Sequence, residues 1–355
     1  MPSGSTAEPL RVGIAGYGLA GEVFHAPLIE TTPGLTVSRV VTSNAERSER
    51  AKANIPGATI VDSVDDLWGD IDLLVVAAPN RFHAELALAA IEHETPVVID
   101  KPFAATVAKA EGVITSGGQV TVFQNRRWDG DFLTIRKLLK QGQLGKITRF
   151  ESRFERFRPV IDEGWRESGD PAAGGGQLAD LGAHLIDQAI VLFGPPVRVY
   201  AEVDRRRCGA QADDDVFVAL EHTGGERSHL FMGKVAPLSG PRFRLAGLEG
   251  GASIDGLDPQ EAQLKSGLRP GSPGYGEGDP GRLVLGAQAV VEPLDLERGS
   301  YEEFYARVVD WVVDGAPPPV DPRESLLVMR VLEAARASSE ENRVVPFTKA
   351  ARPSR

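Results

Sequence analysis

The most constraining feature of this chain is an alternation of short apolar runs with helix-like stretches in its first 124 residues. This alternation is typical of parallel strands joined by crossover helices. We therefore predict that residues 1–124 form a doubly wound parallel sheet with helices on both faces. The candidate strands cover residues 11–16, 35–41, 58–61, 71–78, 96–99 and 119–123.

The first candidate strand runs directly into the sequence GIAGYGLAG, in which Gly16, Gly18 and Gly21 fit the pattern G-x-G-x-x-G. The first glycine permits a tight turn, the second lets the backbone approach a pyrophosphate, and the third lets helix and strand pack closely. In this strand–helix context the pattern predicts a dinucleotide-binding domain. Tyr17 lies within the loop and is a further candidate cofactor contact.

The end of the second candidate strand bears on which dinucleotide is bound. An acidic residue there would hold the ribose 2′-hydroxyl of NAD. This chain instead has Thr42, Ser43 and Asn44, followed by Arg47. Hydroxyl groups and an arginine suit a 2′-phosphate, so we predict NADP as the preferred cofactor and NAD as the alternative. The competing interpretation places Arg47 on a solvated helix face.

The second part of the chain, residues 125–355, shows consecutive strand-like runs with short turns. This pattern is typical of an antiparallel sheet. We predict an α+β domain with a large, mostly antiparallel open sheet, and helices at residues 131–142 and 177–194. A last helix begins near residue 321 with Asp321 as its N-cap, and we expect it to pack back toward the first domain.

Composition limits the range of partners and compartments. The formal net charge of −11 at pH 7 argues against nucleic acid or an anionic membrane as the main partner. No apolar run is long enough to span a bilayer, and the N-terminus lacks the features of a signal peptide, so we expect a cytoplasmic protein. Cys208 is the single cysteine, which excludes an internal disulfide. We predict that Asp213–Asp215 form a solvated turn rather than a metal site.

A candidate acid–base pair follows the three glycines Gly174–Gly176. Asp180 and His184 are four residues apart, so a helix places them on one face. A carboxylate raises the pKa of a neighbouring imidazole and orients its ring, although such pairs also occur in helices without a catalytic role. The glycines indicate a close approach of the backbone to something bulky.

Three motifs together resemble a known family. The glycine loop, Asp100-Lys101-Pro102 and the Asp180–His184 segment occur in the order and at the separations of the glucose–fructose oxidoreductase / inositol dehydrogenase (Gfo/Idh/MocA) family. The resemblance covers residues 11–347 and implies a Rossmann fold followed by an α+β domain. Most members have glutamate at the position of Asp100. Shorter stretches, including PNRFH and NRRWDGDFLT, resemble a branch that contains NADP-dependent scyllo-inositol 2-dehydrogenases.

The resemblance also implies roles for individual residues. His184 would be the general base, or the acid in the reverse direction. Lys101 would hydrogen-bond the reacting oxygen and stabilise alkoxide charge, so that no metal is needed. Asp180 would bind a neighbouring hydroxyl and hold the catalytic group in orientation. We expect Trp165 and Arg166 to line the substrate pocket or to contact another subunit.

Further candidate cofactor contacts lie where later strands of the first domain end. Alternatives stay open for several of them: Asn80 as a helix cap, His83 as a packing residue and Arg127 as one partner of an interdomain salt bridge. Tyr301 and Tyr305, placed before a helix, fit either the core or the cofactor. The candidate contacts are Pro79, Asn80, His83, Asp100, Lys101, Arg127 and Trp128.

The Asp-Lys-Pro motif raises two narrower questions. We predict a cis Lys101–Pro102 bond, because a tight rigid turn there would hold the ammonium group in place. The partner of Asp100 stays open between the cofactor and Lys101. His25, near the glycine loop, is expected to be a packed histidine.

The sequence and the resemblance together predict hydride transfer between nicotinamide and a secondary alcohol of a cyclic polyol or sugar, with scyllo-inositol and scyllo-inosose as the first substrate pair. An aldose or another keto-sugar is the alternative substrate. A nucleotide-binding regulator without turnover is the alternative of another class. The resemblance further implies a homodimer or homotetramer in which another subunit covers one face of the second-domain sheet.

Overall fold

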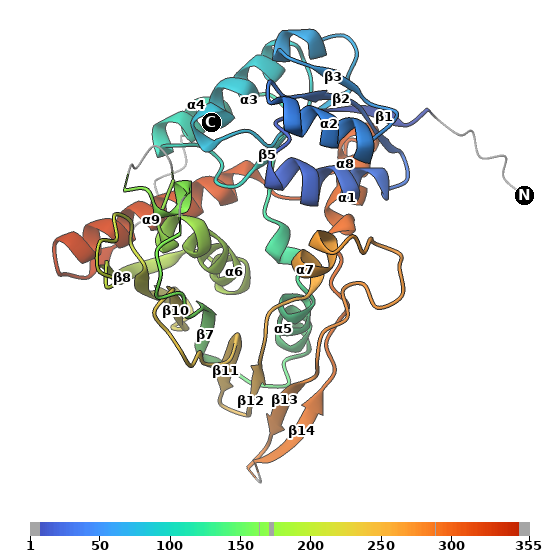
Figure 1. Cartoon of the computed structure of the whole chain (residues 1–355). Coiled ribbons are helices and arrows are strands. Elements are labelled where there is room, and N and C mark those ends of the chain that lie inside the picture. Colours follow the sequence, from blue (N-terminus) through green and yellow to red (C-terminus); the bar gives the residue numbers. More distant parts are fainter. Residues whose placement is uncertain (1–7, 163, 170–173, 288, 348–355) are drawn as a thin grey trace, which may run out of the picture. The chain divides into compact units, whose positions relative to one another are not determined.

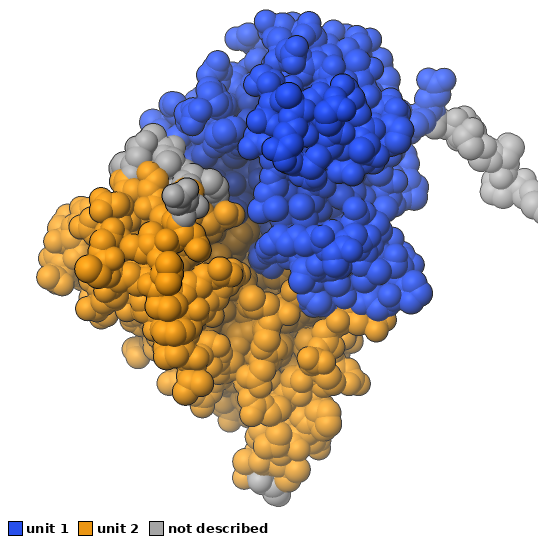
Figure 2. Space-filling model, viewed as in Figure 1, with its two compact units in different colours: residues 1–128, 259–276, 300–323 blue, residues 129–258, 277–299, 324–355 orange. Residues whose placement is uncertain are grey.

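The chain folds into two compact units, which Figure 2 shows in different colours. The computed structural model describes residues 8–162, 164–169, 174–287 and 289–347. The sequence-based division at residue 124 assigned everything after it to the second domain, whereas residues 125–128 and two later segments belong to unit 1. Unit 1 comprises residues 1–128, 259–276 and 300–323, and unit 2 comprises residues 129–258, 277–299 and 324–355.

Unit 1 is built on a six-stranded parallel sheet with the order β3-β2-β1-β4-β5-β6. This is the strand order of the Rossmann fold, in which the direction of winding reverses between β1 and β4 and ligands bind at the carboxyl ends of the strands. The predicted doubly wound parallel sheet is confirmed. The strands are β1 (Leu10–Ala15), β2 (Leu35–Val41), β3 (Thr59–Val61), β4 (Leu73–Val76), β5 (Val97–Asp100) and β6 (Val120–Phe123).

Both faces of this sheet are buried, as the central strand β4 shows. Leu73 and Val75 belong to the core that also contains residues of α1, α2 and α8. Leu74 and Val76 point to the opposite face and are equally buried there, on the side where α3 packs on β4 and β5. The helices of unit 1 (Figure 1) are α1 (Ala26–Glu30), α2 (Ala45–Asn54), α3 (His83–Glu92), α4 (Val107–Thr115), α7 (Gln260–Lys265) and α8 (Glu302–Asp314).

Helix α8 shows why a segment from the end of the chain belongs to unit 1. Its apolar residues recur at helical spacing and form one mostly aromatic, buried stripe. The Phe304 ring meets the Phe123 ring edge-on at 4.9 Å. Tyr301 and Tyr305 are fully buried in the same core, so both are core residues rather than cofactor contacts. Tyr305 lies inside the helix, so the prediction that it precedes the helix was wrong.

Unit 2 is built on a nine-stranded sheet with the order β14-β13-β12-β11-β7-β10-β9-β8-β15. All neighbouring pairs are antiparallel except β7 and β10, which run parallel. The predicted mostly antiparallel sheet is confirmed. The strands are β7 (Ile147–Glu155), β8 (Pro196–Asp204), β9 (Asp215–His222), β10 (Arg227–Gly233), β11 (Phe243–Gly247), β12 (Gly250–Ile254), β13 (Gly281–Leu285), β14 (Val290–Leu294) and β15 (Val345–Pro346).

Three helices, α5 (Gly130–Gln141), α6 (Ala183–Phe193) and α9 (Pro322–Glu340), bury apolar residues in the core of unit 2. Asp321 accepts a hydrogen bond from the Arg323 N–H at 2.9 Å, as expected of the predicted N-cap. The buried Val328, Val331 and Ala335 of α9 contribute to the unit 2 core. In the described part of the chain, no helix combines the length and apolarity needed to cross a bilayer.

Candidate active site

The three glycines of the first loop have different steric surroundings. Gly16 has a φ of 105°, and a Cβ there would lie 2.7 Å from the Ala77 carbonyl oxygen. A Cβ on Gly21 would lie 2.3 Å from the Gly16 carbonyl oxygen. A Cβ on Gly18 would meet nothing within 4 Å. The fold itself therefore requires the first and third glycines, while the middle one leaves the open space that a pyrophosphate needs.

Two ring side chains around this loop point into the core. Tyr17 is 1 % exposed, so the loop offers a ligand its backbone and not this ring. His25 ends the short π-helical turn η1 (Ala20–His25) and is fully buried, with Nδ1 2.6 Å from the Tyr305 hydroxyl oxygen. Burial lowers the pKa of His25 to about 4, so the ring is neutral at physiological pH. His25 is the packed histidine that the sequence suggested.

The carboxyl end of β2 presents the residues expected to select the cofactor. Ser43 and Arg47 are exposed, and Thr42 is largely buried. Asn44 is the N-cap of α2 and accepts a hydrogen bond from the Arg47 N–H at 2.9 Å. Arg50 is engaged elsewhere: its guanidinium pairs with Glu46 at 2.6 Å and with Glu22 at 3.0 Å. Arg47 is therefore the exposed candidate arginine in the first turn of α2, the helix that follows β2.

The turn after β4 holds polar groups that point to ligand binding. Pro79 is exposed and precedes the 3₁₀ turn η3 (Asn80–Phe82). The amide oxygen of Asn80 is buried and has no hydrogen-bond partner among the described residues. Asn80 makes no side-chain cap, so the alternative that it is an ordinary helix cap was wrong. The two ring nitrogens of His83 lie 2.8 Å from the Ala78 carbonyl oxygen and 2.7 Å from the Pro102 carbonyl oxygen.

His83 thus links this turn to the Asp100-Lys101-Pro102 turn at the end of β5. Asp100 Oδ1 accepts a hydrogen bond from the Lys101 N–H at 2.8 Å. The sequence left the partner of Asp100 open, and this contact shows that the carboxylate closes the turn at Lys101. The Lys101–Pro102 peptide bond is cis, as predicted. Lys101 itself is half-buried.

The short turn η4 (Asn125–Trp128) follows β6 and is buried throughout. Trp128 meets Phe304 edge-on at 5.4 Å and belongs to the core of unit 1. Arg126 pairs with Glu261 at 2.5 Å and donates to the Tyr301 hydroxyl at 3.2 Å. Arg127 is also buried. In this unit the turn ties the sheet to α7 and α8.

In unit 2, His184 lies in the first turn of α6 and Asp180 just before this helix, and both are largely buried. The predicted helix begins with a π-helical turn, η7 (Leu178–Gly182), which contains Asp180 and which the sequence did not indicate. Such turns are frequent at functional sites. Arg166 lies in the short turn η5 (Trp165–Glu167), and its Nε donates to Asp180 Oδ2 at 2.9 Å. The Trp165 side chain lies outside the described parts.

Asp213 holds the start of this helix. Its Oδ2 accepts a hydrogen bond from the Leu178 N–H at 2.7 Å, and its carbonyl oxygen accepts from the Gln177 N–H at 3.0 Å. A Cβ on Gly176 would lie 2.1 Å from Asp213 Oδ1, so the close approach that the glycines indicated is to this carboxylate. Burial raises the pKa of Asp213 more than the Leu178 N–H lowers it.

The prediction of a solvated turn at Asp213–Asp215 was therefore wrong. Asp214 is fully buried, and its Oδ2 pairs with Arg207 Nε at 2.8 Å. Arg207 also pairs with Glu167. The sequence did not indicate the roles of these residues, because Glu167 and Leu178 are distant in the chain and the nearby Arg207 forms no recognisable motif with Asp214.

Unit 1 thus gathers the predicted cofactor residues at the carboxyl ends of β1, β2, β4 and β5, and unit 2 brings Arg166 and Asp180 together.

The sequence was compared with models of known protein families. Residues 10–117 match the profile "Oxidoreductase family, NAD-binding Rossmann fold". Residues 136–347 match the profile "Oxidoreductase family, C-terminal alpha/beta domain". The chain belongs to the Gfo/Idh/MocA oxidoreductase family. The glycine loop and the buried Asn80 amide oxygen fit the nicotinamide cofactor of such a domain.

Relatives in the Gfo/Idh/MocA family align along nearly the whole chain. A scyllo-inositol 2-dehydrogenase (NADP(+)) of Bacillus subtilis is 34% identical over 95% of this chain and 96% of its own length. An uncharacterised oxidoreductase of Escherichia coli is 39% identical over 94% and 97%. The solved structure of a Yersinia pestis protein assigned as an oxidoreductase has a TM-score of 0.90 and 36% identity over 98% of this chain and 99% of its own.

Proposed function

We propose that this oxidoreductase interconverts a secondary alcohol and a ketone on a cyclic polyol, with NADP as its cofactor and scyllo-inositol as its substrate. The observation that carries the proposal is the 34% identity, over 95% of the chain, to a scyllo-inositol 2-dehydrogenase (NADP(+)). The site residues of both units agree with this chemistry.

The cofactor preference is supported by the residues after β2. An NAD-selective site needs a carboxylate at this position, and here the chain presents Thr42, Ser43 and the exposed Arg47. An arginine guanidinium binds phosphate oxygens through charge-assisted hydrogen bonds. The side chains of Ser43 and Arg47 are therefore the proposed contacts of the 2′-phosphate.

The proposed reaction removes a hydride from the alcohol carbon and a proton from its oxygen, which leaves a ketone. When bound, the cofactor supplies the hydride acceptor. His184 takes the hydroxyl proton, and the ammonium group of Lys101 stabilises the negative charge that develops on the oxygen. Asp180, oriented by Arg166, accepts a hydrogen bond from a neighbouring hydroxyl. The Asp100 carboxylate and His83 hold the turn that carries Lys101.

A panel of polyols and sugars tests this proposal, with NAD and NADP in parallel and nicotinamide absorbance as the readout. Turnover of an aldose or another keto-sugar in place of inositols would redirect the substrate assignment within the same fold. Tight cofactor binding without turnover on any member of the panel would contradict the proposal and favour a nucleotide-binding regulator.

We also propose that a second copy of this chain covers the open face of the unit 2 sheet. Tyr200, Phe217 and Phe231 are half-buried on that face, opposite the face that packs against α5, α6 and α9. The rings of Phe217 and Phe231 are 5.0 Å apart, and the Arg153 guanidinium lies 4.3 Å from the Phe231 ring. Aromatic residues and arginine are enriched at protein interfaces. Light scattering that finds only monomers at micromolar concentration would refute this.

A further inference from the structure

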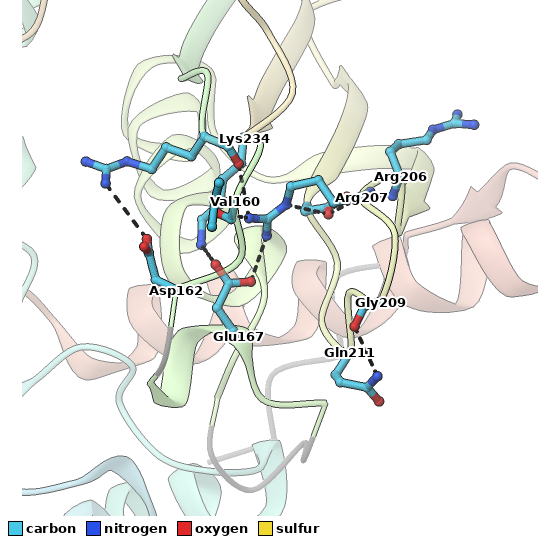
Figure 3. Close-up of polar contacts among 10 residues, drawn as sticks. Val160, Asp162, Glu167, Arg206, Arg207, Gly209, Gln211 and Lys234 are labelled. Carbon is cyan, nitrogen blue, oxygen red and sulfur yellow. Dashed lines mark hydrogen bonds and ion pairs between the residues drawn. The ribbon is translucent and has the colours of Figure 1, made fainter.

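Glu167, the residue after Arg166, belongs to a cluster of charges with Arg207, Asp214 and Lys234, and Figure 3 labels Glu167, Arg207 and Lys234. The Glu167 carboxylate, whose side chain is 9% exposed, uses both oxygens in ion pairs. Oε2 accepts from Arg207 Nη2 at 2.7 Å, and Oε1 accepts from the ammonium group of Lys234. Lys234 follows β10 and Arg207 follows β8, so Glu167 ties its loop to two strands of the sheet.

Arg207 is the centre of this cluster. Its Nε donates to Asp214 Oδ2 at 2.8 Å, and its Nη1 donates to the carbonyl oxygens of Arg158 and Val160, each at 3.2 Å. The three guanidinium nitrogens therefore bind two carboxylates and two backbone carbonyls. The planar, forked geometry of arginine fixes the relative positions of all these groups, which a lysine in its place would not do.

The surroundings of the cluster favour the ionised form of both carboxylates. Burial alone would raise the pKa of Glu167, but the hydrogen bonds and charges of Lys234 and Arg207 outweigh it and hold that pKa below its usual value. The pKa of Asp214 is likewise lowered, because the N–H groups of Arg206 and Arg207 and the Arg207 side chain outweigh the effect of burial. Two carboxylates thus face two cations, of which Asp214 and Arg207 are buried and Glu167 and Lys234 are slightly exposed. Such a cluster adds little stability over apolar packing, so a role in fixing one geometry is the better account of it.

The geometry that it fixes is that of the Arg166–Asp180 pair. Arg166 is the residue before Glu167, its Nε binds Asp180, and its carbonyl oxygen accepts from the Gly176 N–H at 3.0 Å. Asp213, the residue before Asp214, caps the helical turn that contains Asp180. Both partners of the pair are therefore anchored through the adjacent residues Asp213 and Asp214.

We infer that the Glu167–Arg207–Asp214–Lys234 cluster sets the position of Arg166, and through it of Asp180, so that Glu167 is a positioning residue for the alcohol substrate. This inference rests on the proposed function for its kinetic consequence. A small displacement of a substrate-orienting group costs about 100-fold in rate, so loosening the cluster affects the alcohol far more than the cofactor.

The test combines hydrogen–deuterium exchange with steady-state kinetics on the full chain. The variants are Glu167→Gln and the milder Lys234→Gln, which leaves the Glu167–Arg207 pair in place. The matched control is Arg206→Gln, because Arg206 neighbours Arg207 and its side chain makes exposed ion pairs with Asp204 and Asp215. Cofactor affinity is measured separately by the fluorescence of the reduced nicotinamide.

In Glu167→Gln we expect exchange in peptides covering residues 158–169 to accelerate about tenfold or more, and kcat/KM for the alcohol to fall about 10- to 100-fold. The dissociation constant of the cofactor stays within about twofold. Lys234→Gln shows the same changes at smaller size, and Arg206→Gln shows neither.

Unchanged exchange in both cluster variants would overturn the inference, whatever the substrate. Accelerated exchange with wild-type kcat/KM would also overturn it, because the cluster would then stabilise the loop without positioning Asp180. If the wild-type protein turns over no alcohol, the proposed function fails. The exchange result then still decides whether Glu167 holds the Arg166 segment.

Discussion

The Nε atom of Arg166 donates a hydrogen bond to the Oδ2 atom of Asp180 across 2.9 Å. This pair joins the turn η5 to the π-helical turn η7 and so links a loop to the helix that carries His184. A carboxylate that is held in this way can orient a substrate hydroxyl without reorganising during the reaction. The Arg166–Asp180 pair defines the substrate side of the proposed site.

The first prediction concerns the acid–base and electrostatic groups. Lys101→Ala and His184→Ala should each lower kcat for the alcohol by about 100-fold or more, because charge stabilisation and proton transfer each contribute that much. Cofactor binding should persist in both variants. The matched controls are Lys109→Ala and His93→Ala, which change exposed residues of unit 1 and should leave kcat unchanged. Near wild-type rates in either site variant would contradict the assignment.

The second prediction concerns the choice between NADP and NAD. Arg47→Gln should raise KM for NADP about tenfold and leave KM for NAD nearly unchanged, because it removes one charge-assisted contact to a phosphate. Arg50→Gln is the control, since the Arg50 guanidinium is already paired with Glu22 and Glu46. An equal effect of Arg47→Gln on both cofactors would show that this side chain does not contact the 2′-phosphate.

The third prediction separates steric crowding from backbone strain at Gly176. Gly176 and Gly225 have φ values of 92° and 89°, but only at Gly176 would a Cβ collide with another group, Asp213 Oδ1 at 2.1 Å. Gly225→Ala should cost about 1–2 kcal/mol of unfolding free energy for its backbone conformation alone. Gly176→Ala should cost clearly more in chemical denaturation and should also lower kcat/KM for the alcohol. Equal costs would show that the Asp213 carboxylate moves aside easily.

These residues also show what the sequence could predict. The parallel sheet of unit 1 and the glycine loop follow from local patterns, because parallel strands joined by crossover helices appear in the chain as alternating apolar runs and helical stretches. The Asp213–Asp215 run was misjudged, because its burial depends on Arg207 and on Glu167, which is distant in sequence. A local run of aspartates predicts a solvated turn, because the sequence does not show that residues such as Glu167 and Arg207 pack around it.

The membership of late segments in unit 1 could not be predicted for the same reason. The stripe of aromatic residues in α8 predicts a buried helix face, but not which core buries it. The π-helical turn at Asp180 likewise has no signal in the spacing of apolar residues. Long-range packing decided both features.

The fourth prediction concerns acid stability. Arg126 and Lys265 outweigh the effect of burial and lower the pKa of Glu261 from 4.5 to about 2. A carboxylate with a lowered pKa stabilises the folded state above pH 4.5, and that contribution is lost as the pH falls toward 2. Glu261→Gln should therefore lower the unfolding free energy by about 3 kcal/mol at pH 7.

The difference between wild type and Glu261→Gln in urea denaturation should shrink steadily below pH 4.5. Glu303→Gln is the matched control, because Glu303 pairs with Arg307 at the exposed surface of α8 and should matter little at any pH. A difference for Glu261→Gln that does not change with pH would show that the loss comes from packing rather than from the charge.

The most direct test of the proposed function compares scyllo-inositol with NADP against myo-inositol with NAD, in the same enzyme preparation and with nicotinamide absorbance as the readout. We expect kcat/KM to be about tenfold or more higher for scyllo-inositol with NADP, because the chain is similar to a scyllo-inositol 2-dehydrogenase (NADP(+)) and the residues after β2 lack the carboxylate that favours NAD. Equal or faster turnover of myo-inositol with NAD, or no turnover of either pair, would contradict the proposed function.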